Sequence, residues 1–326
     1  MTRDHTHTPT MPRRSRIGLL LALLTAAAFG TSGAFARSLI DAGWSPAAAV
    51  TARVCVAALV LLVPSVLALR GRWHVLRRNL SMITFFGLVA VAGCQVAYFN
   101  AVQHLSVGVA LLLEYMGIIL VVGWLWARHR QRPRKLTIGG TVVSILGLAL
   151  VLDLAGDTTV DVVGVLWGLV AAVGLAVFFV VSAKSDPELP PLVMAGGGMT
   201  VGAIALLALG AVGVLPLAAN TDDVLFAGHD VPWWVPVAGL SLIAAVFAYV
   251  VGIMAARALG SKLSSFVGLT EVLFAVLFAW LLLGQLPTAV QLIGGALIVV
   301  GVAMVRVDEL RADDAPTEPV VPSTAG

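Results

Sequence analysis

The chain contains few charged residues and few cysteines. Only 11% of its 326 residues are Asp, Glu, Lys or Arg, whereas soluble domains carry about 25%. This scarcity excludes an ordinary water-soluble domain. The two cysteines, Cys55 and Cys94, both fall within apolar segments, so no disulfide framework is expected. The six histidines lie in tails, loops or at segment ends, and we expect no metal site and no cofactor.

Long apolar runs dominate what is present, because 60% of the residues are hydrophobic. Most of these runs exceed the roughly 20 residues that cross the hydrocarbon layer as a helix. Backbone groups in lipid must be satisfied within the chain, which favours helices. The sequence therefore predicts an all-α integral membrane protein with ten transmembrane helices, at residues 17–40, 46–69, 80–101, 105–127, 136–153, 162–183, 191–215, 233–257, 262–284 and 288–307.

The basic residues indicate the orientation of these helices. They gather in the tails and in alternate connections, chiefly at 13–16, 70–78 and 128–135. By the positive-inside rule both termini face the cytoplasm. The opposite connections carry acidic residues instead, at Asp41, Asp153, Asp157, Asp161, Asp222, Asp223 and Asp230. The basic pI therefore reflects membrane anchoring, and we expect no nucleic-acid partner.

The two ends of the chain differ from its interior. Residues 1–16 and 308–326 are predicted to be disordered cytoplasmic tails, the second being rich in Pro, Asp and Glu. The run after `RRSR`, with `AFA` at 34–36, has features of a signal peptide. It is longer than a usual signal core, so we expect it to remain as the first helix. The preference for Arg over Lys, with much Ala, Val and Gly, points to a bacterial source.

An internal repeat organises the chain. The segment `EYMGIILVVGWLWARHRQRPRKLTIGG` starts at Glu114, and `EVLFAVLFAWLLLGQLPTAVQLIGG` starts at Glu271. Each places a Glu inside an apolar run and ends on `IGG`. With five helices per copy, the second copy must be inverted relative to the first. We predict two inverted five-helix repeats, at 17–153 and 162–307.

These segments resemble the EamA-type branch of the drug/metabolite transporter superfamily. The similarity is greatest in the second `EVLF` segment, although Glu271-Val272 and Gly284-Gln285 stand where the family usually has Glu-Pro and Gly-Glu. `TARVCVAALVLLV` at 51–63 and `AAFGTSGAFAR` at 27–37 resemble its second and first helices. The resemblance implies a secondary transporter in the bacterial cytoplasmic membrane. It would export a small polar metabolite, most plausibly an amino acid, in exchange for protons.

Two carboxylates sit where water is scarce. Glu114 lies nine residues after Leu105, and Glu271 lies nine residues after Lys262, which places both about 14 Å into a helix and near the bilayer midplane. A charge there is costly unless it is wet, paired or protonated. Small neighbours leave room beside both. Glu114 and Glu271 are therefore candidates for substrate or proton binding, and structural hydrogen bonding between helices is the alternative.

Other polar residues within the apolar segments extend this candidate site. Arg53 could pair with either carboxylate, hold a substrate carboxylate, or reach the outer headgroups. Gln95 and Tyr98 share a helix face, and Tyr249 lies in the middle of the eighth segment. These three could line a polar path or simply pack. Arg37 and Trp167 are expected to lie at the membrane interface.

The spacing of four glycines and the possible pairing of Arg53 each give a further expectation. Gly140 and Gly147, like Gly294 and Gly301, are spaced to share one helix face. The fifth and tenth helices should use these faces for close contacts. If Arg53 pairs with Glu114, that carboxylate stays ionised, and Glu271 becomes the proton site by elimination.

An intramembrane enzyme and a scaffold are the two alternatives to transport. `GTSG` at 30–33 matches the serine motif of rhomboid proteases, but the apolar segments contain no His that could act as its base. We therefore expect that the protein is not an enzyme. A scaffold or accessory subunit without transport needs no charges inside its membrane segments, so Glu114, Glu271 and Arg53 count against it.

Overall fold

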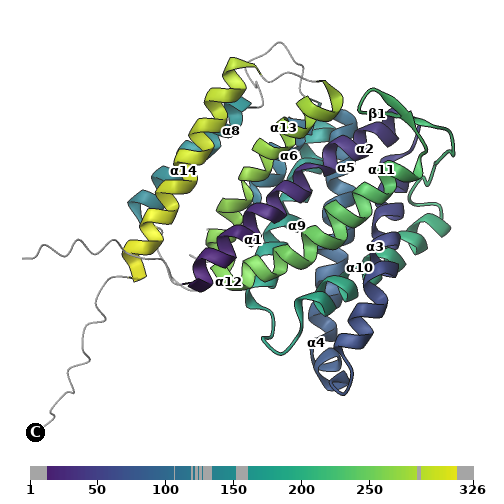
Figure 1. Cartoon of the computed structure of the whole chain (residues 1–326), viewed down its shortest axis with the longest axis horizontal. Helices are drawn as coiled ribbons and strands as arrows, with labels where there is room; N and C mark the ends of the chain where they lie inside the picture. Colours follow the sequence, from purple (N-terminus) through teal and green to yellow (C-terminus); the bar gives the residue numbers. More distant parts are fainter. Residues whose placement is uncertain are drawn as a thin grey trace, which may run out of the picture.

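The computed structural model describes residues 13–105, 107–118, 120, 121, 124, 127, 134–151, 161–284 and 288–313. Nearly all of them are helical (Figure 1). The first half contains α1 (Arg13–Gly30), α2 (Ser32–Asp41), α3 (Pro46–Ala68), α4 (Trp73–Phe85), η1 (Phe86–Gly93), α5 (Cys94–His104), α6 (Val107–Tyr115) and α8 (Lys135–Val151). The second half contains α9 (Val162–Lys184), α10 (Pro191–Ala211), α11 (Trp234–Ala238), η2 (Gly239–Phe247), α12 (Ala248–Gly268), α13 (Thr270–Leu283) and α14 (Ala289–Asp313).

Within the described residues, six helical stretches are long and apolar enough to cross a membrane. They are Arg16–Asp41, Pro46–Ala68, Trp73–His104, Val162–Lys184, Pro191–Ala211 and Trp234–Gly268. Shorter apolar helices occur at Lys135–Gly147, Thr270–Leu282 and Leu292–Val305. Many Leu, Ile and Val side chains on these helices are exposed, as expected for surfaces that contact lipid instead of water.

Several of the long helices are irregular near their centres. The helical pattern is interrupted at Thr31, between α1 and α2. The third and eighth predicted segments each contain a π-helix, η1 and η2. Gly260 breaks α12 with φ 79° and ψ 164°, a backbone conformation that glycine adopts without steric cost. This break lies between the predicted eighth and ninth helices.

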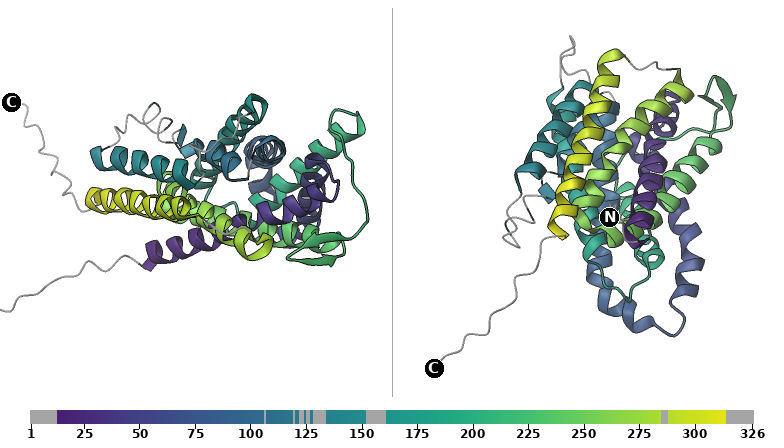
Figure 2. Two further views of the ribbon diagram at one scale, coloured as in Figure 1. Left: turned by 90° about the horizontal axis from the view of Figure 1, so that it is seen from above. Right: turned by 60° about the vertical axis from the view of Figure 1, so that its left-hand side comes forward.

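The glycine-lined faces of α8 and α14 pack against one another, which confirms the predicted close contacts. A Cβ atom on Gly140 would lie 2.7 Å from the carbonyl oxygen of Gly301, and one on Gly147 would lie 2.6 Å from that of Gly294. The order of these contacts makes the two helices antiparallel. They lie side by side at one edge of the bundle (Figures 1 and 2).

Two segments extend beyond their predicted boundaries. Helix α14 continues to Asp313, so the C-terminal tail begins later than residue 308. Asp308 is only 5% exposed and accepts a hydrogen bond from Thr137 Oγ1 at 2.5 Å, which holds this extension against α8. The third segment is longer than predicted, because α4, η1 and α5 run from Trp73 to His104. Residues 314–326 lie outside the described part of the chain.

A short hairpin interrupts the otherwise helical structure. Strands β1 (Val224–Phe226) and β2 (His229–Val231) pair antiparallel in the connection between α10 and α11. Phe226 stacks on Phe35 of α2 with ring centroids 5.1 Å apart. This contact fixes the hairpin over the end of α2, and nothing in the apolar pattern of the sequence predicted it.

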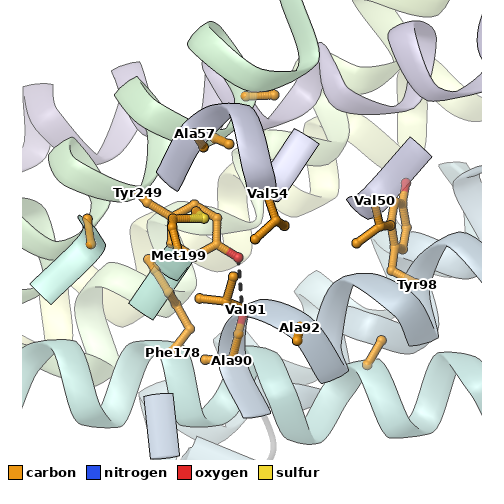
Figure 3. Close-up of a cluster of buried hydrophobic side chains, with 14 of the residues drawn as sticks. Val50, Val54, Ala57, Ala90, Val91, Ala92, Tyr98, Phe178, Met199 and Tyr249 are labelled. Atoms are coloured by element: carbon orange, nitrogen blue, oxygen red, sulfur yellow. Dashed lines mark hydrogen bonds between the residues drawn. The ribbon is translucent and has the colours of Figure 1, made fainter. Parts of the chain in front are cut away.

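The core lies where α3, η1, α9, α10 and α12 meet. Small and branched residues of α3, namely Val50, Val54 and Ala57, face this core together (Figure 3). Phe178 of α9 packs edge-on against Tyr249 of α12, with ring centroids 5.4 Å apart. The polar groups described below are embedded in this core.

Candidate functional site

Both predicted carboxylates stand beside an interruption of their helix. Glu114 is the second-last residue of α6, and the amide of Met116 bonds back three residues, to the Leu113 carbonyl. Glu271 lies in the first turn of α13, just after the break at Leu269. Both side chains are half-buried. Interrupted helices inside a membrane leave backbone groups that must find other partners or a ligand.

Glu271 is bound by a tyrosine from the other repeat. The Tyr115 hydroxyl lies 2.7 Å from Glu271 Oε2 and 2.7 Å from the carbonyl oxygen of Gly268. A hydroxyl carries one proton, so it donates to only one of these acceptors at a time. When Glu271 is protonated, it can donate to the Tyr115 oxygen while Tyr115 donates to Gly268. When Glu271 is ionised, the two acceptors compete for the same proton.

Glu114 has a weaker partner. The thiol of Cys94, the first residue of α5, lies 3.4 Å from Glu114 Oε1 and 3.4 Å from the carbonyl oxygen of Ala171. A thiol is a poor hydrogen-bond donor. The Glu114 carboxyl is therefore held less firmly than that of Glu271. It also lies on α6 beside Gly117, where α9 approaches so closely that a Cβ would meet the Ala172 carbonyl at 2.5 Å.

Arg53 does not pair with either carboxylate, which corrects the pairing considered from the sequence. Its Nη1 donates to Ser32 Oγ at 3.0 Å, and its Nη2 donates to the Ala244 carbonyl. The side chain is 3% exposed, so it does not reach the headgroups either. Ala244 belongs to η2, and a π-helix shifts the backbone hydrogen-bond register, which gives a buried donor such as Arg53 a carbonyl to bind.

Gln95 and Tyr249 bind one another across the two repeats. Gln95 Nε2 donates to the Tyr249 hydroxyl at 2.9 Å, and that hydroxyl donates to the Ala90 carbonyl of η1 at 3.1 Å (Figure 3). Each of the two π-helices thus supplies a backbone carbonyl to a buried polar side chain, Ala90 of η1 to Tyr249 and Ala244 of η2 to Arg53.

A small cavity adjoins Glu271. Its volume is about 30 Å³, which is room for roughly two water molecules. It lies between α1, α9, α12 and α13, and its lining includes Thr25, Phe29, Tyr115, Phe178, Ser264 and Glu271. The Thr25 hydroxyl is buried without a hydrogen-bond partner in the described structure. The cavity therefore combines aromatic walls with a carboxyl and an unused hydroxyl.

Tyr98 lies apart from these hydrogen bonds. It is buried beside Phe99, with ring centroids 5.7 Å apart. Figure 3 shows it next to Val50, on the far side of the cluster from Tyr249. Arg37 is exposed and pairs with Asp41 one helical turn away, at 2.9 Å, and Trp167 is 36% exposed. Their location at the membrane interface stays a prediction.

Three contributors escaped the sequence analysis. Tyr115 and Cys94 bind the two carboxylates, and Ser32 binds Arg53. Tyr115 follows Glu114 directly in the sequence, which was the available signal for it. In a regular helix neighbouring side chains diverge by about 100°. Tyr115 therefore points away from Glu114, its neighbour in the sequence, and binds Glu271 instead.

Polar contacts outside the apolar segments close one end of the bundle. Arg78 of α4 binds Asp186 and, at 3.0 Å, Glu188, both in the connection between α9 and α10. A hydrogen bond from Asn79, the Glu188 amide and the Arg78 guanidinium together lower the pKa of Asp186 to about 2. Arg257 holds the same connection through the Ser185 hydroxyl at 2.8 Å.

This connection gives a testable dependence on pH. The pKa of Asp186 is lower in the fold than the ordinary value of about 3.9, so its contribution to stability is full above about pH 4 and is lost as the pH falls towards 2. We expect Asp186→Asn to lower the melting temperature at pH 7 and to reduce the loss of stability between pH 4 and 2. Asp223→Asn, at an exposed position, should change neither. Equal melting curves for both variants would contradict the assignment.

Comparison with known proteins supplies a family. The sequence matches the EamA-like transporter family twice, over residues 16–153 and 162–307. It is 22% identical over 302 residues to a Salmonella typhimurium protein named as an uncharacterized inner membrane transporter, YicL, covering 91% of this chain and 97% of the relative. It is 26% identical over 225 residues to an uncharacterized transporter of Archaeoglobus fulgidus, covering 69% and 75% of the two chains.

A solved structure shares the fold. One crystal structure superposes with a TM-score of 0.72 over 91% of this chain and 98% of the other, at 19% sequence identity. The apolar helices and the family match together describe a multi-pass protein of the bacterial cytoplasmic membrane. Because the family pattern covers both halves of the sequence, the chain belongs to the EamA-like transporter family.

Proposed function

We propose that this chain is a secondary transporter that exports a small polar metabolite in exchange for protons. The substrate binds among the buried polar groups at the centre of the bundle, and an amino acid fits the size and polarity expected. The family match supports transport in general. The substrate, the direction and the coupling to protons are our inference from the site.

The proposed architecture is ten membrane helices in two inverted five-helix repeats, with both termini in the cytoplasm. The count of ten is supported by described helices that overlap each predicted segment, when α1 with α2, α4 with η1 and α5, and α11 with η2 and α12 up to Gly260 are each counted as one. The antiparallel contact of α8 with α14, the fifth and tenth segments, supports the inverted relation.

The hydrogen bonds of Tyr115 carry the proposal of proton coupling. The single hydroxyl proton of Tyr115 can be donated to Glu271 or to the Gly268 carbonyl. When Glu271 is protonated, it donates to Tyr115, and both hydrogen bonds form together. Gly268 is the last residue of α12, next to the break at Leu269. Loading or losing a proton at Glu271 therefore changes the hydrogen bonding at a joint between two helices. That link between protonation and backbone is what a proton-driven transporter requires.

Flux in proteoliposomes tests the function. A screen of metabolites for growth protection on overexpression would first nominate a solute. We expect the purified protein to accumulate that labelled solute against its gradient when a pH gradient is imposed, and to stop when a protonophore collapses the gradient. Liposomes without protein are the control. A chain that moves no nominated solute under any gradient would favour the scaffold alternative.

The proposed topology has its own test. A cysteine replacing Asp223, in the connection between α10 and α11, should react with an impermeant thiol reagent added outside intact cells. A cysteine replacing Arg72, at the start of α4, should react only after the cells are opened. The unsubstituted chain is the matched control, because Cys55 and Cys94 both lie within apolar helices. The reverse labelling pattern would invert the proposed orientation.

A further inference from the structure

Arg53 is a buried cation without an anionic hydrogen-bond partner. Its side chain is 3% exposed, and two of its nitrogens bind the Ser32 hydroxyl and the Ala244 carbonyl, which are both neutral. Its Nε is buried and has no hydrogen-bond partner in the described structure. An unpaired charge inside a membrane protein is costly, and such residues usually mark a substrate or ion path.

A second source of positive potential meets Arg53 at Ser32. The helical pattern is interrupted at Thr31, and Ser32 is the first residue of the ten-residue helix α2. The first turn of a helix has backbone N–H groups without intrahelical acceptors, and the helix dipole makes this end positive. Such helix ends favour anionic groups, including those at the broken helices of transporters.

The two half-buried carboxylates do not neutralise this junction by contact. Glu114 and Glu271 lie within electrostatic range of Arg53, but their hydrogen bonds go to Cys94 and Tyr115. The Arg53 guanidinium therefore uses two of its five N–H groups on neutral acceptors, and its Nε has no partner in the described structure. A guanidinium binds a carboxylate through two parallel N–H groups, and the unpartnered Nε provides one of them.

We infer that the junction of Arg53 with Ser32 and the start of α2 binds the carboxylate of the transported solute. This inference rests on the proposed transport function and names the chemical class of its substrate. The solute carboxylate binds the N–H of Nε together with the second N–H of a terminal guanidinium nitrogen. A lipid phosphate is the other anion available in a membrane, but the burial of Arg53 favours a small solute that enters the bundle.

Paired solutes test the inference. The probes are neutral L-amino acids and the corresponding L-amino acid amides, which keep the side chain and the amine and lack the carboxylate. Binding is measured by calorimetry on the full chain in detergent without phospholipid, which removes the lipid phosphate. We expect at least one acid to bind at least tenfold more tightly than its amide. An acid and amide of equal affinity, or an acid preference that appears only when phospholipid is added, would overturn the inference.

Variants assign the preference to this junction. Arg53→Gln should abolish the preference for the acid, and Arg53→Lys should retain part of it, because charge remains and the paired donors are lost. Arg37→Gln, on the exposed part of α2, is the control and should bind as the unsubstituted chain does. If Arg53→Gln fails to fold, Ser32→Ala should still weaken binding of the acid and leave the amide unchanged. An unaltered preference in Arg53→Gln or in Ser32→Ala would refute the assignment.

Failure of this inference is distinct from failure of the proposed function. If proteoliposomes move a nominated solute that carries no carboxylate, and Arg53→Gln moves it equally well, transport stands and the carboxylate site is wrong. If no solute moves with any gradient, the function itself is wrong.

Discussion

Glu271→Gln should abolish transport driven by a pH gradient while sparing the exchange of labelled for unlabelled solute. Glutamine keeps the shape of the side chain and donates a hydrogen bond to Tyr115, as a protonated Glu271 would. Unlike a glutamic acid, glutamine has no carboxyl proton to lose. The variant therefore stays in one state of the hydrogen-bond set that joins Glu271, Tyr115 and the Gly268 carbonyl. We expect the gradient-driven rate to fall at least tenfold.

The same experiment separates the two carboxylates. Among the described residues, Glu114 is bound by the Cys94 thiol, at 3.4 Å, and by no hydroxyl that also contacts the backbone between two helices, as Tyr115 does for Glu271. Glu114→Gln should weaken substrate binding or folding and keep the response to pH in the protein that remains. Asp230→Asn, in the exposed hairpin, should behave as the unsubstituted chain. Full gradient-driven transport by Glu271→Gln would show that the proton site lies elsewhere.

Tyr115 offers an independent check on this mechanism. Tyr115→Phe keeps the ring and the carboxyl but removes the proton that Glu271 and Gly268 share. If the hydroxyl links protonation to the helix joint, this variant should bind solute yet respond weakly to pH. Exchange of labelled for unlabelled solute by Tyr115→Phe and by Glu271→Gln, measured in the same liposomes, distinguishes such uncoupling from a loss of folded protein.

Much of this site was predictable because burial of charge in lipid leaves a clear signal. Glu114, Glu271 and Arg53 stand out in apolar runs whatever the fold, and the repeat around `IGG` indicated which of them correspond. Their partners were not predictable. Tyr115 lies on α6 and meets Glu271 on α13, and a contact between distant helices depends on how the two repeats pack. Local sequence patterns do not predict that packing.

Of the interpretations considered for Arg53, the ion pair with a carboxylate is wrong for a specific physical reason. Opposite charges attract at long range, which made such a pair one of the arrangements that the sequence suggested. Helix η2 instead presents the Ala244 carbonyl to the guanidinium. The segments `FGLVAVAG` and `GLSLIAAVF` that form the two π-helices are ordinary apolar runs without proline. A change in backbone hydrogen-bond register of this kind arises from tertiary contacts and leaves no mark in hydropathy.

The predicted tail illustrates the same limit. Its charged composition suggested disorder from residue 308, yet α14 runs on to Asp313. The Asp308 carboxylate is accommodated because Thr137 of α8 lies opposite it. Composition predicts whether a segment can bury apolar surface, but a single polar pair across two packed helices can extend the ordered region.

The contact between α8 and α14 supports the last prediction, which compares two adjacent glycines. A Cβ on Gly140 would meet the backbone oxygen of Gly301 at 2.7 Å and Val305 Cγ2 at 2.8 Å, whereas one on Gly139 would meet only the methyl end of Met304, at 3.2 Å. A flexible methionine can move aside, but a helix backbone cannot without separating the pair. We expect Gly140→Ala to destabilise the protein by about 1–3 kcal/mol, as overpacking does.

Gly139→Ala is the matched control, because it makes the same chemical change one residue away in the same helix. Alanine also has a higher helix propensity than glycine, so this variant should be as stable as the unsubstituted chain or slightly more stable. Thermal unfolding of the purified proteins, followed by the loss of the monodisperse peak on gel filtration, measures both. Because the contacts of Gly140 and Gly301 are reciprocal, Gly301→Ala should resemble Gly140→Ala. If both alanines on α8 had the same effect, the helices would be held together by something other than the close approach of their backbones.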